Sequence, residues 1–309
     1  MIVTVTPNPA LDLTYQVPII DLGETHRVPA AAARAGGKGL NVARVAHQQG
    51  HPVLAIAPAG GLTGDEFTAE LASSGLPHHL VPVRAATRRT VALVDAERGQ
   101  TSIFTEFGEN HTPAEWQHLT DAAAAALPDA DCLVGSGSLP AGADTDFFAN
   151  LVVLARQNGL PIVIDTSGPG LVTAARAGAT VLKPNRRELA EASGDDDPVR
   201  AAQLLLRLGA GLVLISLGEE GMLAVSSEAP GRPWRARLPR VLAGNPTGAG
   251  DAAVAAAAVL LAAGPVDPEL VLRRATAWSA AAVLMPFAGE ISAEHAALAD
   301  ELIIDRENP

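Results

Sequence analysis

Short apolar runs alternate with longer segments of helical periodicity along most of the chain. The apolar runs, rich in Val, Ile and Leu, occupy residues 2–6, 53–57, 132–135, 161–166, 180–185, 211–216 and 222–226. Helices are predicted near residues 40–49, 64–74, 114–127, 144–158, 169–177, 186–193, 198–209, 249–263, 267–284 and 293–304. Strands that alternate with helices indicate crossover connections. The pattern therefore predicts an α/β fold with a mostly parallel sheet, helices on both faces and ligands at the carboxyl ends of the strands.

Two regions depart from this alternation. Apolar and polar residues alternate in "LDLTYQVPII" (11–20), and "TRRTVALVDAERGQTSIFTEF" (87–107) has the pattern of two strands joined by the turn "AERG". A period of two with a polar face indicates a half-exposed sheet. We therefore expect a small sheet, formed by about residues 11–35 and 86–108 and inserted in a single domain over 1–309. Such a sheet could be a lid, a dimer surface or both.

Composition and charge narrow the classes of partner. The chain has 309 residues, 48% of them hydrophobic, which is enough for one large domain. The net charge of −12 predicts a protein that repels nucleic acid and anionic membranes, so an anionic ligand needs a local cluster of positive side chains. The single cysteine, Cys132, fits a reducing compartment, and the first residues lack the pattern of a signal peptide. We expect a cytoplasmic protein.

Two glycine-rich loops resemble phosphate-binding motifs without matching them. In "AGGKGLNVAR" (35–44), Gly39 stands where a P-loop has the serine or threonine that binds magnesium. In "GSGSLP" (135–140), Pro140 replaces the third glycine of a dinucleotide fingerprint. Each loop alone is more typical of a tight turn between a strand and a helix.

A third loop combines small residues with a carboxylate. Gly248, Ala249 and Gly250 precede a long alanine-rich helix in "NPTGAGDAAVAAAAV", and a helix N-terminus favours anions. Asp251 stands in the first turn of this helix. It either complements the helix dipole or is a general base beside an oxyanion site, the juxtaposition that phosphoryl transfer requires.

A polar pair follows the apolar run that ends near residue 185. Asn185 and Glu188 are three residues apart in "KPNRRELAE", so they face the same side of a helix. They form either a capping box or a pair that orients magnesium-bound water near a triphosphate. The turn "SLGEEG" (216–221) could hold a nucleotide, whereas the histidines form no metal motif and no catalytic-triad context is present.

Taken together, the motifs resemble those of the PfkB carbohydrate kinases in the ribokinase superfamily. The resemblance covers almost the whole chain and is closest to the branch of 1-phosphofructokinases and tagatose-6-phosphate kinases. It rests on motifs that occur in the family's order: "TPNPALD", "GGKGLNVAR", "PAGGLTGDEF", "TRRTVALVD", "SGSLPAG", "IDTSG", "KPNRREL", "SLGEEGML" and "NPTGAGDA". The resemblance implies a ribokinase-like three-layer αβα body with a β-sheet lid.

The resemblance also implies roles for individual residues. It makes Asp251 the base that accepts the hydroxyl proton, with Gly248, Ala249 and Gly250 as the anion hole. The residues that it assigns to ATP are Lys183, Ser216, Gly218, Gly221 and Gly248, with Asn185 and Glu188 placing Mg²⁺ through water. The residues that it assigns to the sugar are Asp12, Gly37, Asn41 and Ser138, with Lys38 and Arg88 binding the phosphate that the substrate already carries.

The expected reaction is ATP-dependent phosphorylation of a ketohexose phosphate, with fructose 1-phosphate as the first candidate. Tagatose 6-phosphate and fructose 6-phosphate are alternatives, and the substitutions Thr90, Ala253 and Ala256 leave the sugar open because they depart from the family's pattern. A ribokinase-like kinase of an unphosphorylated sugar or nucleoside is a second reading, and a catalytically silent sugar-phosphate binding protein is a third.

We also expect a homodimer through the lids. The lid's exposed face, expected to carry Val91, Leu93, Ile103 and Phe107, would be an apolar patch if it were left bare.

Overall fold

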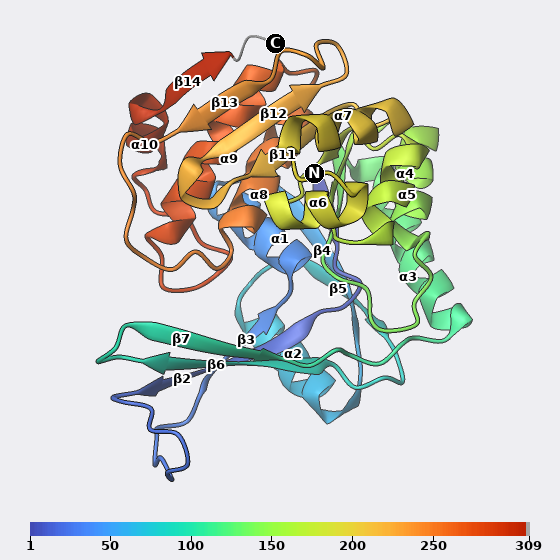
Figure 1. Cartoon of the computed structure of the whole chain (residues 1–309). Helices are drawn as coiled ribbons and strands as arrows, with labels where there is room; N and C mark the ends of the chain where they lie inside the picture. Colours follow the sequence, from blue (N-terminus) through green and yellow to red (C-terminus); the bar gives the residue numbers. More distant parts are fainter. Residues whose placement is uncertain (307–309) are drawn as a thin grey trace.

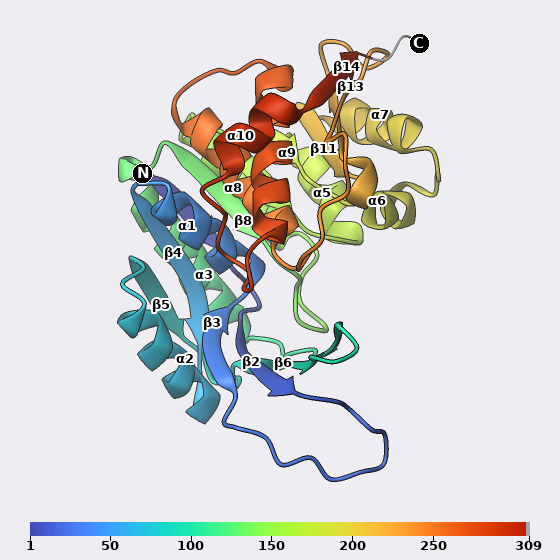
Figure 2. The same cartoon turned by 90° about the vertical axis from the view of Figure 1, so that its left-hand side faces the viewer.

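The computed structural model describes residues 1–306 and contains two sheets. The larger sheet forms the centre of the body (Figures 1 and 2). From one edge to the other its strands are β14 (Ile303–Arg306), β13 (Trp234–Arg237), β12 (Met222–Ser226), β11 (Leu212–Ser216), β10 (Val181–Leu182), β9 (Ile162–Asp165), β8 (Cys132–Ser136), β1 (Ile2–Val5), β4 (Val53–Ala59) and β5 (His78–Pro82). Pairing is parallel from β5 to β11 and antiparallel from β11 to β14, so the prediction of a mostly parallel sheet is confirmed.

Helices cover both faces of this sheet and complete a three-layer body. On one side lie α1 (Lys38–Gln48), α2 (Gly61–Ser73), α8 (Ala249–Ala262), α9 (Pro268–Val283) and α10 (His295–Glu301). On the other lie α3 (Pro113–Ala126), α4 (Phe147–Gln157), α5 (Pro169–Ala177), α6 (Arg186–Ser193) and α7 (Pro198–Leu208). Successive residues of β1 serve the two cores in turn, since Ile2 joins the first and Val3 the second. This alternation is the period of two expected for a strand that is buried on both faces.

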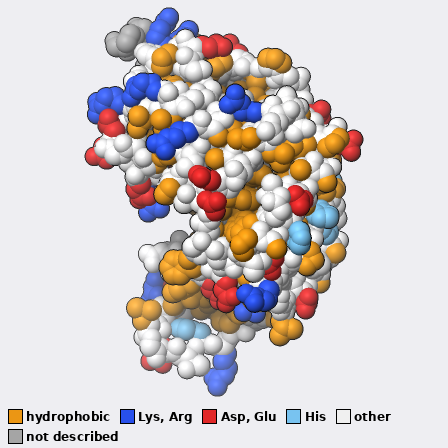
Figure 3. Space-filling model, turned by 90° about the vertical axis from the view of Figure 1, so that its right-hand side faces the viewer, with side chains coloured by type: hydrophobic (Ala, Val, Ile, Leu, Met, Phe, Trp, Pro, Cys, Tyr) orange, Lys and Arg blue, Asp and Glu red, His pale blue; other side chains and the backbone are white. Residues whose placement is uncertain are grey.

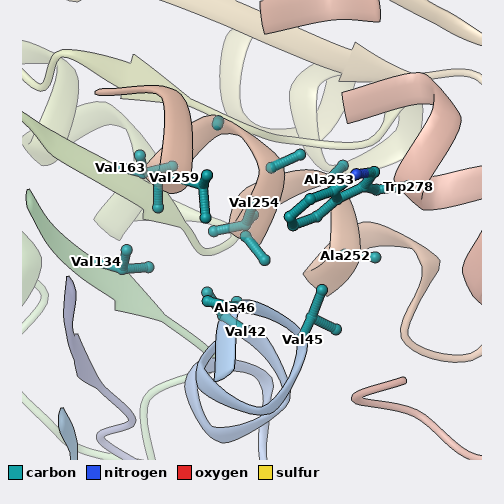
Figure 4. Close-up of a cluster of buried hydrophobic side chains, with 14 of the residues drawn as sticks. Val42, Val45, Ala46, Val134, Val163, Ala252, Ala253, Val254, Val259 and Trp278 are labelled. Carbon is teal, nitrogen blue, oxygen red and sulfur yellow. The ribbon is translucent and has the colours of Figure 1, made fainter. Parts of the chain in front are cut away.

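Helix α8 is the most deeply buried helix of the site. Every residue from Asp251 to Leu260 is buried, and the helix packs against α1 and α9. Figure 4 shows Val254 and Val259 of α8 lying among Val42 of α1 and Val163 of β9. The many alanines leave room for neighbouring backbones to approach closely. The first turn of α8 is thereby held against the sheet.

A second, smaller sheet has four strands. Its order is β3 (Ala32–Gly36), β2 (Ala10–Val17), β6 (Arg88–Asp95) and β7 (Gln100–Thr105), with the last two strands joined by a turn at residues 96–99. We call it the small sheet. It extends to one side below the body, and the space-filling view shows a notch between the two (Figures 1 and 3).

The expected apolar face of the small sheet is wrong in one respect. Ile103 pairs with Ala92, whereas Val91 pairs with Phe104. Directly paired residues share a face and neighbours along a strand do not. Ile103 therefore lies on the face opposite to Val91 and Leu93, and Phe107 follows the end of β7. The exposed fraction is 51% for Ile103, 63% for Phe104 and 87% for Phe107.

Some of the described strands were not predicted from the sequence. They include β5, β13 and β14. The helix expected over 293–304 ends at Glu301, and β14 follows it from Ile303. Over the described residues, no helix is both long and apolar enough to cross a membrane.

Candidate active site

A cleft of about 720 Å³ lies where the carboxyl ends of the body strands face the small sheet. The structure brings nearly all of the predicted site residues to it. Those that line it are Asp12, Gly37, Lys38, Asn41, Arg88, Lys183, Asn185, Glu188, Ser216, Gly218, Gly221, Gly248, Ala249, Gly250 and Asp251. Ser138 is the predicted residue that does not line it, although its hydroxyl accepts a hydrogen bond from Asn8 at 3.3 Å beside the cleft.

Asp251 is the third residue of α8 and is only 6% exposed. Its Oδ2 accepts a hydrogen bond of 2.8 Å from Asn41 Nδ2 of α1, so the partner of the carboxylate lies on another helix. Burial in the first place, and the negative charge of Asp165 in the second, raise the pKa of Asp251 to about 7. Such a group can accept a proton near neutral pH, which a purely helix-complementing carboxylate does not need to do.

The loop before Asp251 needs its glycine. Gly248 has φ of +86°, and a Cβ there would lie 2.8 Å from Cα of Ala288. Gly250 approaches the Lys183 ammonium, since a Cβ at Gly250 would lie 3.3 Å from Nζ. The start of α8 thus combines unhindered backbone with a buried positive charge, as an anion site requires.

Asp165, at the end of β9, lines the cleft and was not singled out from the sequence. Its Oδ2 lies 3.4 Å from Lys38 Nζ and its Oδ1 lies 3.6 Å from Lys183 Nζ. Burial alone would raise the pKa of Asp165, but the two lysines hold it below its ordinary value. The available signal was a lone carboxylate that ends a buried strand, in "PIVIDT".

Lys38 makes ion pairs within the body, and its predicted role in binding the substrate's phosphate stays a prediction. Besides Asp165 it contacts Glu188 Oε1 at 3.7 Å, and attraction to Asp165 raises the pKa of Lys38 despite its burial. The lysine is therefore held among the carboxylates of the body. Its ammonium lines the same cleft as Arg88, which lies on the small sheet.

Asn185 and Glu188 form a capping box, which is one of the two arrangements expected for them from the sequence. Asn185 Oδ1 accepts from Glu188 N at 2.9 Å, and Glu188 Oε2 accepts from Asn185 N at 2.9 Å. The box uses one carboxylate oxygen of Glu188. The other, Oε1, remains on the cleft side with Lys38, so capping and a second role are compatible.

Asp12 faces the cleft from the small sheet. It pairs across the strands with Arg34 of β3 and Thr90 of β6. Burial raises the pKa of Asp12 to about 6, against the opposing effects of a hydrogen bond with Thr90 and the charge of Arg88. Gly36 makes room for the carboxylate, because a Cβ there would lie 1.9 Å from Asp12 Oδ2.

Arg88 begins β6 at the junction between the small sheet and the body. Its Nη1 donates to the carbonyl of Glu106 at 3.0 Å and its Nη2 to the carbonyl of Asn8 at 3.1 Å. Burial lowers the pKa of Arg88. The guanidinium therefore has a structural role at the junction as well as a place on the cleft wall.

Comparison with known proteins decides the family. Residues 6–294 match the family described as pfkB family carbohydrate kinase. The chain belongs to the PfkB family of carbohydrate kinases.

Relatives of this PfkB protein include several phosphofructokinases. It is 35% identical to the ATP-dependent 6-phosphofructokinase isozyme 2 of Mycobacterium tuberculosis over 269 residues, which cover 85% of this chain and 78% of that one. It is 36% identical to the 1-phosphofructokinase of Xanthomonas campestris over 290 residues, which cover 90% and 89%.

A solved structure supports the fold directly. The phosphofructokinase-2 of Escherichia coli in complex with fructose-6-phosphate superposes with a TM-score of 0.81 at 31% identity, covering 91% of this chain and 93% of that one. The ribokinase-like arrangement and the family expected from the motifs are thus confirmed.

The cleft of this PfkB protein is also lined by residues that the motifs did not indicate. Ser216 and the 3₁₀ turn η2 (Gly218–Glu220) end β11 as expected. The opposite wall is formed by Leu238, Val241, Leu242, Thr276, Ser279, Ala280 and Val283. These residues come from an irregular loop and from one side of α9, where an apolar helix face is indistinguishable in sequence from a core face.

Proposed function

We propose that the protein transfers the γ-phosphate of ATP to a hydroxyl of fructose 1-phosphate and yields fructose 1,6-bisphosphate. The observation that carries this proposal is the shared cleft of Asp251 and Arg88. A buried carboxylate with a pKa raised to about 7 lies on one wall, and a cation suited to a phosphate dianion lies on the other. A neutral sugar would not need that cation.

The proposed chemistry follows from the placement of the chain's own groups. Asp251 accepts the proton of the substrate hydroxyl, whose oxygen forms the new bond to the γ-phosphorus. The bond from that phosphorus to the β–γ bridging oxygen breaks, and ADP leaves. Backbone N–H groups of Gly248 to Gly250 and the ammonium of Lys183 stabilise the charge on the transferred group. Asp12 accepts hydrogen bonds from sugar hydroxyls.

The residues present fit a magnesium ion held mainly through water. Mg²⁺ keeps several waters and takes one or two carboxylates together with substrate phosphates. Among the described residues Asp165 Oδ1 has no hydrogen-bond partner, although Lys183 Nζ lies 3.6 Å away, and Glu188 Oε1 is free of the capping box. Asn185 and Glu188 would hold the ion through its waters, and the bound ion would neutralise phosphate charge.

The test is a coupled ADP-release assay with the purified protein. The substrates are fructose 1-phosphate, fructose 6-phosphate, tagatose 6-phosphate, fructose, ribose and adenosine. We expect the highest kcat/KM with fructose 1-phosphate. Fructose 6-phosphate is the second candidate, because relatives of similar identity carry both phosphofructokinase names. A preference for free fructose or adenosine would overturn the sugar-phosphate proposal, and no turnover with any of them would favour a silent binding protein.

The proposal includes a homodimer formed through the small sheets and a place in the cytoplasm. Strand β7 is an edge strand on which every residue is exposed, and an uncovered edge with apolar side chains favours pairing with another copy. The single cysteine, Cys132, is a buried free thiol, which suits a reducing compartment.

A further inference from the structure

An ion pair joins the small sheet to the body beside the cleft. Arg34 Nη1 of β3 lies 3.0 Å from Glu290 Oε1, in the segment between α9 and α10. Both side chains are partly accessible, at 24% and 33% exposed. The Arg34 guanidinium also lies 5.8 Å from the ring centroid of Phe287.

The position of Arg34 is fixed by its neighbour in β3. The amide of Ala35 donates to Glu70 Oε2 at 2.7 Å, and its carbonyl accepts from Arg44 Nη2 at 3.0 Å. Arg44 of α1 and Glu70 of α2 also form an ion pair at 3.1 Å, so both helices hold the backbone of β3 at Ala35. Arg34 is also the direct cross-strand partner of Asp12. A shift of Arg34 therefore moves the part of the small sheet that carries Asp12.

The position of Glu290 is fixed equally well. The next residue, Ile291, donates to Gln48 Oε1 at 2.9 Å and accepts from Gln48 Nε2 at 3.0 Å. The preceding residue, Gly289, has φ of +83° and contacts α1, because a Cβ there would lie 3.2 Å from Asn41 Oδ1. Asn41 donates to Asp251. Glu290 is therefore the sequence neighbour of Gly289, which contacts Asn41, the hydrogen-bond partner of Asp251.

We propose that Arg34 and Glu290 are a positioning pair that sets the approach of the small sheet to the body, and with it the separation of Asp12 and Asp251. Neither residue touches the reacting atoms. A pair of this accessibility changes an equilibrium by only about two- to fivefold, which lets the small sheet open for substrate and favours its return. The proposal rests on the sugar-phosphate kinase activity proposed above.

The test compares Glu290→Gln, Arg34→Met and the double variant. If the pair acts as one contact, each single variant raises KM for fructose 1-phosphate about two- to fivefold, with kcat and KM for ATP unchanged. The double variant is then no worse than either single one. Glu269→Gln is the matched control, since it breaks an accessible pair with Arg273 (3.5 Å) on α9 and should leave all constants unchanged.

An electrostatic action on Asp12 predicts a different result. Removing Arg34 would raise the pKa of Asp12, whereas removing Glu290 would not, so only Arg34→Met would change sugar binding. A change in Arg34→Met alone, additive losses or an unchanged KM would overturn the positioning pair.

A second readout does not depend on turnover. Hydrogen exchange in residues 10–17 and 88–95 should be faster in both single variants than in the Glu269→Gln control. Unchanged exchange would overturn the pair. The exchange difference between the variants and the control could be present even if the wild-type protein phosphorylates none of the sugar phosphates. That combination would overturn only the proposed activity.

Discussion

At the scale of single residues, the burial of Asp251 has a direct kinetic consequence. We expect Asp251→Asn to retain the fold and ATP binding but to lose turnover by roughly 10²–10⁴-fold, because a positioned base contributes about that much. In the wild-type protein kcat should fall as pH drops below about 7, where Asp251 becomes protonated. Steady-state kinetics and nucleotide binding measured on the same preparation check both points. A near-wild-type kcat in the variant would mean that Asp251 is not the base and only complements the helix dipole.

The same residue should lower stability as the pH rises towards neutral. Its pKa is about 7 in the folded protein against an ordinary value of 3.8, so the unfolded chain ionises first as pH rises. Stability that is present below pH 3.8 is then lost progressively up to about pH 7. Asp251→Asn removes this loss, and the gain should grow by up to about 1.4 kcal/mol per pH unit over that range. Urea unfolding at pH 5 and pH 8 measures the difference, and an equal gain at both values would contradict the argument.

Arg88 tests the identity of the substrate. A hydrogen bond to a charged group contributes about 1.5–3 kcal/mol, so Arg88→Ala should raise KM for fructose 1-phosphate by roughly 10–100-fold. Residual activity with free fructose should change little, since that substrate has no dianion. The control is Arg89→Ala, on the opposite face of β6. Equal losses on both substrates would assign Arg88 to the junction, where it already holds the carbonyls of Asn8 and Glu106.

At the scale of elements, the start of α6 separates capping from metal placement. Glu188→Gln keeps an oxygen that can accept from Asn185 N and therefore keeps the capping box, but it removes the charge. We expect the magnesium concentration for half-maximal rate to rise by roughly tenfold, with KM for the sugar phosphate unchanged.

The chain supplies a matched control for this variant. Helix α3 begins with the same type of box, formed by Thr112 and Glu115 away from the cleft. Glu115→Gln should leave the magnesium dependence unaltered. Glu115→Gln should at most lower thermal stability. If Glu188→Gln also lowers only thermal stability and leaves the magnesium dependence unchanged, then Glu188 has only the role of capping α6.

The elements that the sequence predicted are those with a strong local pattern. The buried parallel strands and the hairpin over 88–105 follow from apolar runs and from alternation. Strand β13, "WRAR", is short and charged, and β14 follows directly on a helix, so neither has a local signal. Strand β13 pairs with β12, and β14 pairs with β13. Both strands therefore depend on tertiary contacts with the rest of the sheet and not on a local sequence pattern.

The candidate site shows the same division. Asp251 and its glycine loop could be found because a helix start carries a recognisable set of residues. Asp165 could not be singled out, since its role depends on Lys38 and Lys183 arriving from distant segments. The pairing of Arg34 with Glu290 has no sequence signal at all.

At the scale of the whole molecule, the edge of the small sheet should determine assembly. Phe104 and Ile103 extend from opposite faces of β7 and are both more than half exposed. We expect Phe104→Ser combined with Ile103→Ser to convert a homodimer to a monomer in analytical ultracentrifugation. Leu270→Ser, a change at an exposed apolar residue of α9, is the control. A variant that remains dimeric would place the interface elsewhere.

The bond between Asn41 and Asp251 joins residues that are 210 positions apart. On the ribosome, a nascent chain can form its first strands and α1 long before α8 has been made. Helix α8 must then insert against α1 and be covered by α9 before its carboxylate is fixed. Until α9 has emerged, the carboxylate of Asp251 is not held in place. A chain synthesised only as far as α8 is therefore expected to lack the proposed activity.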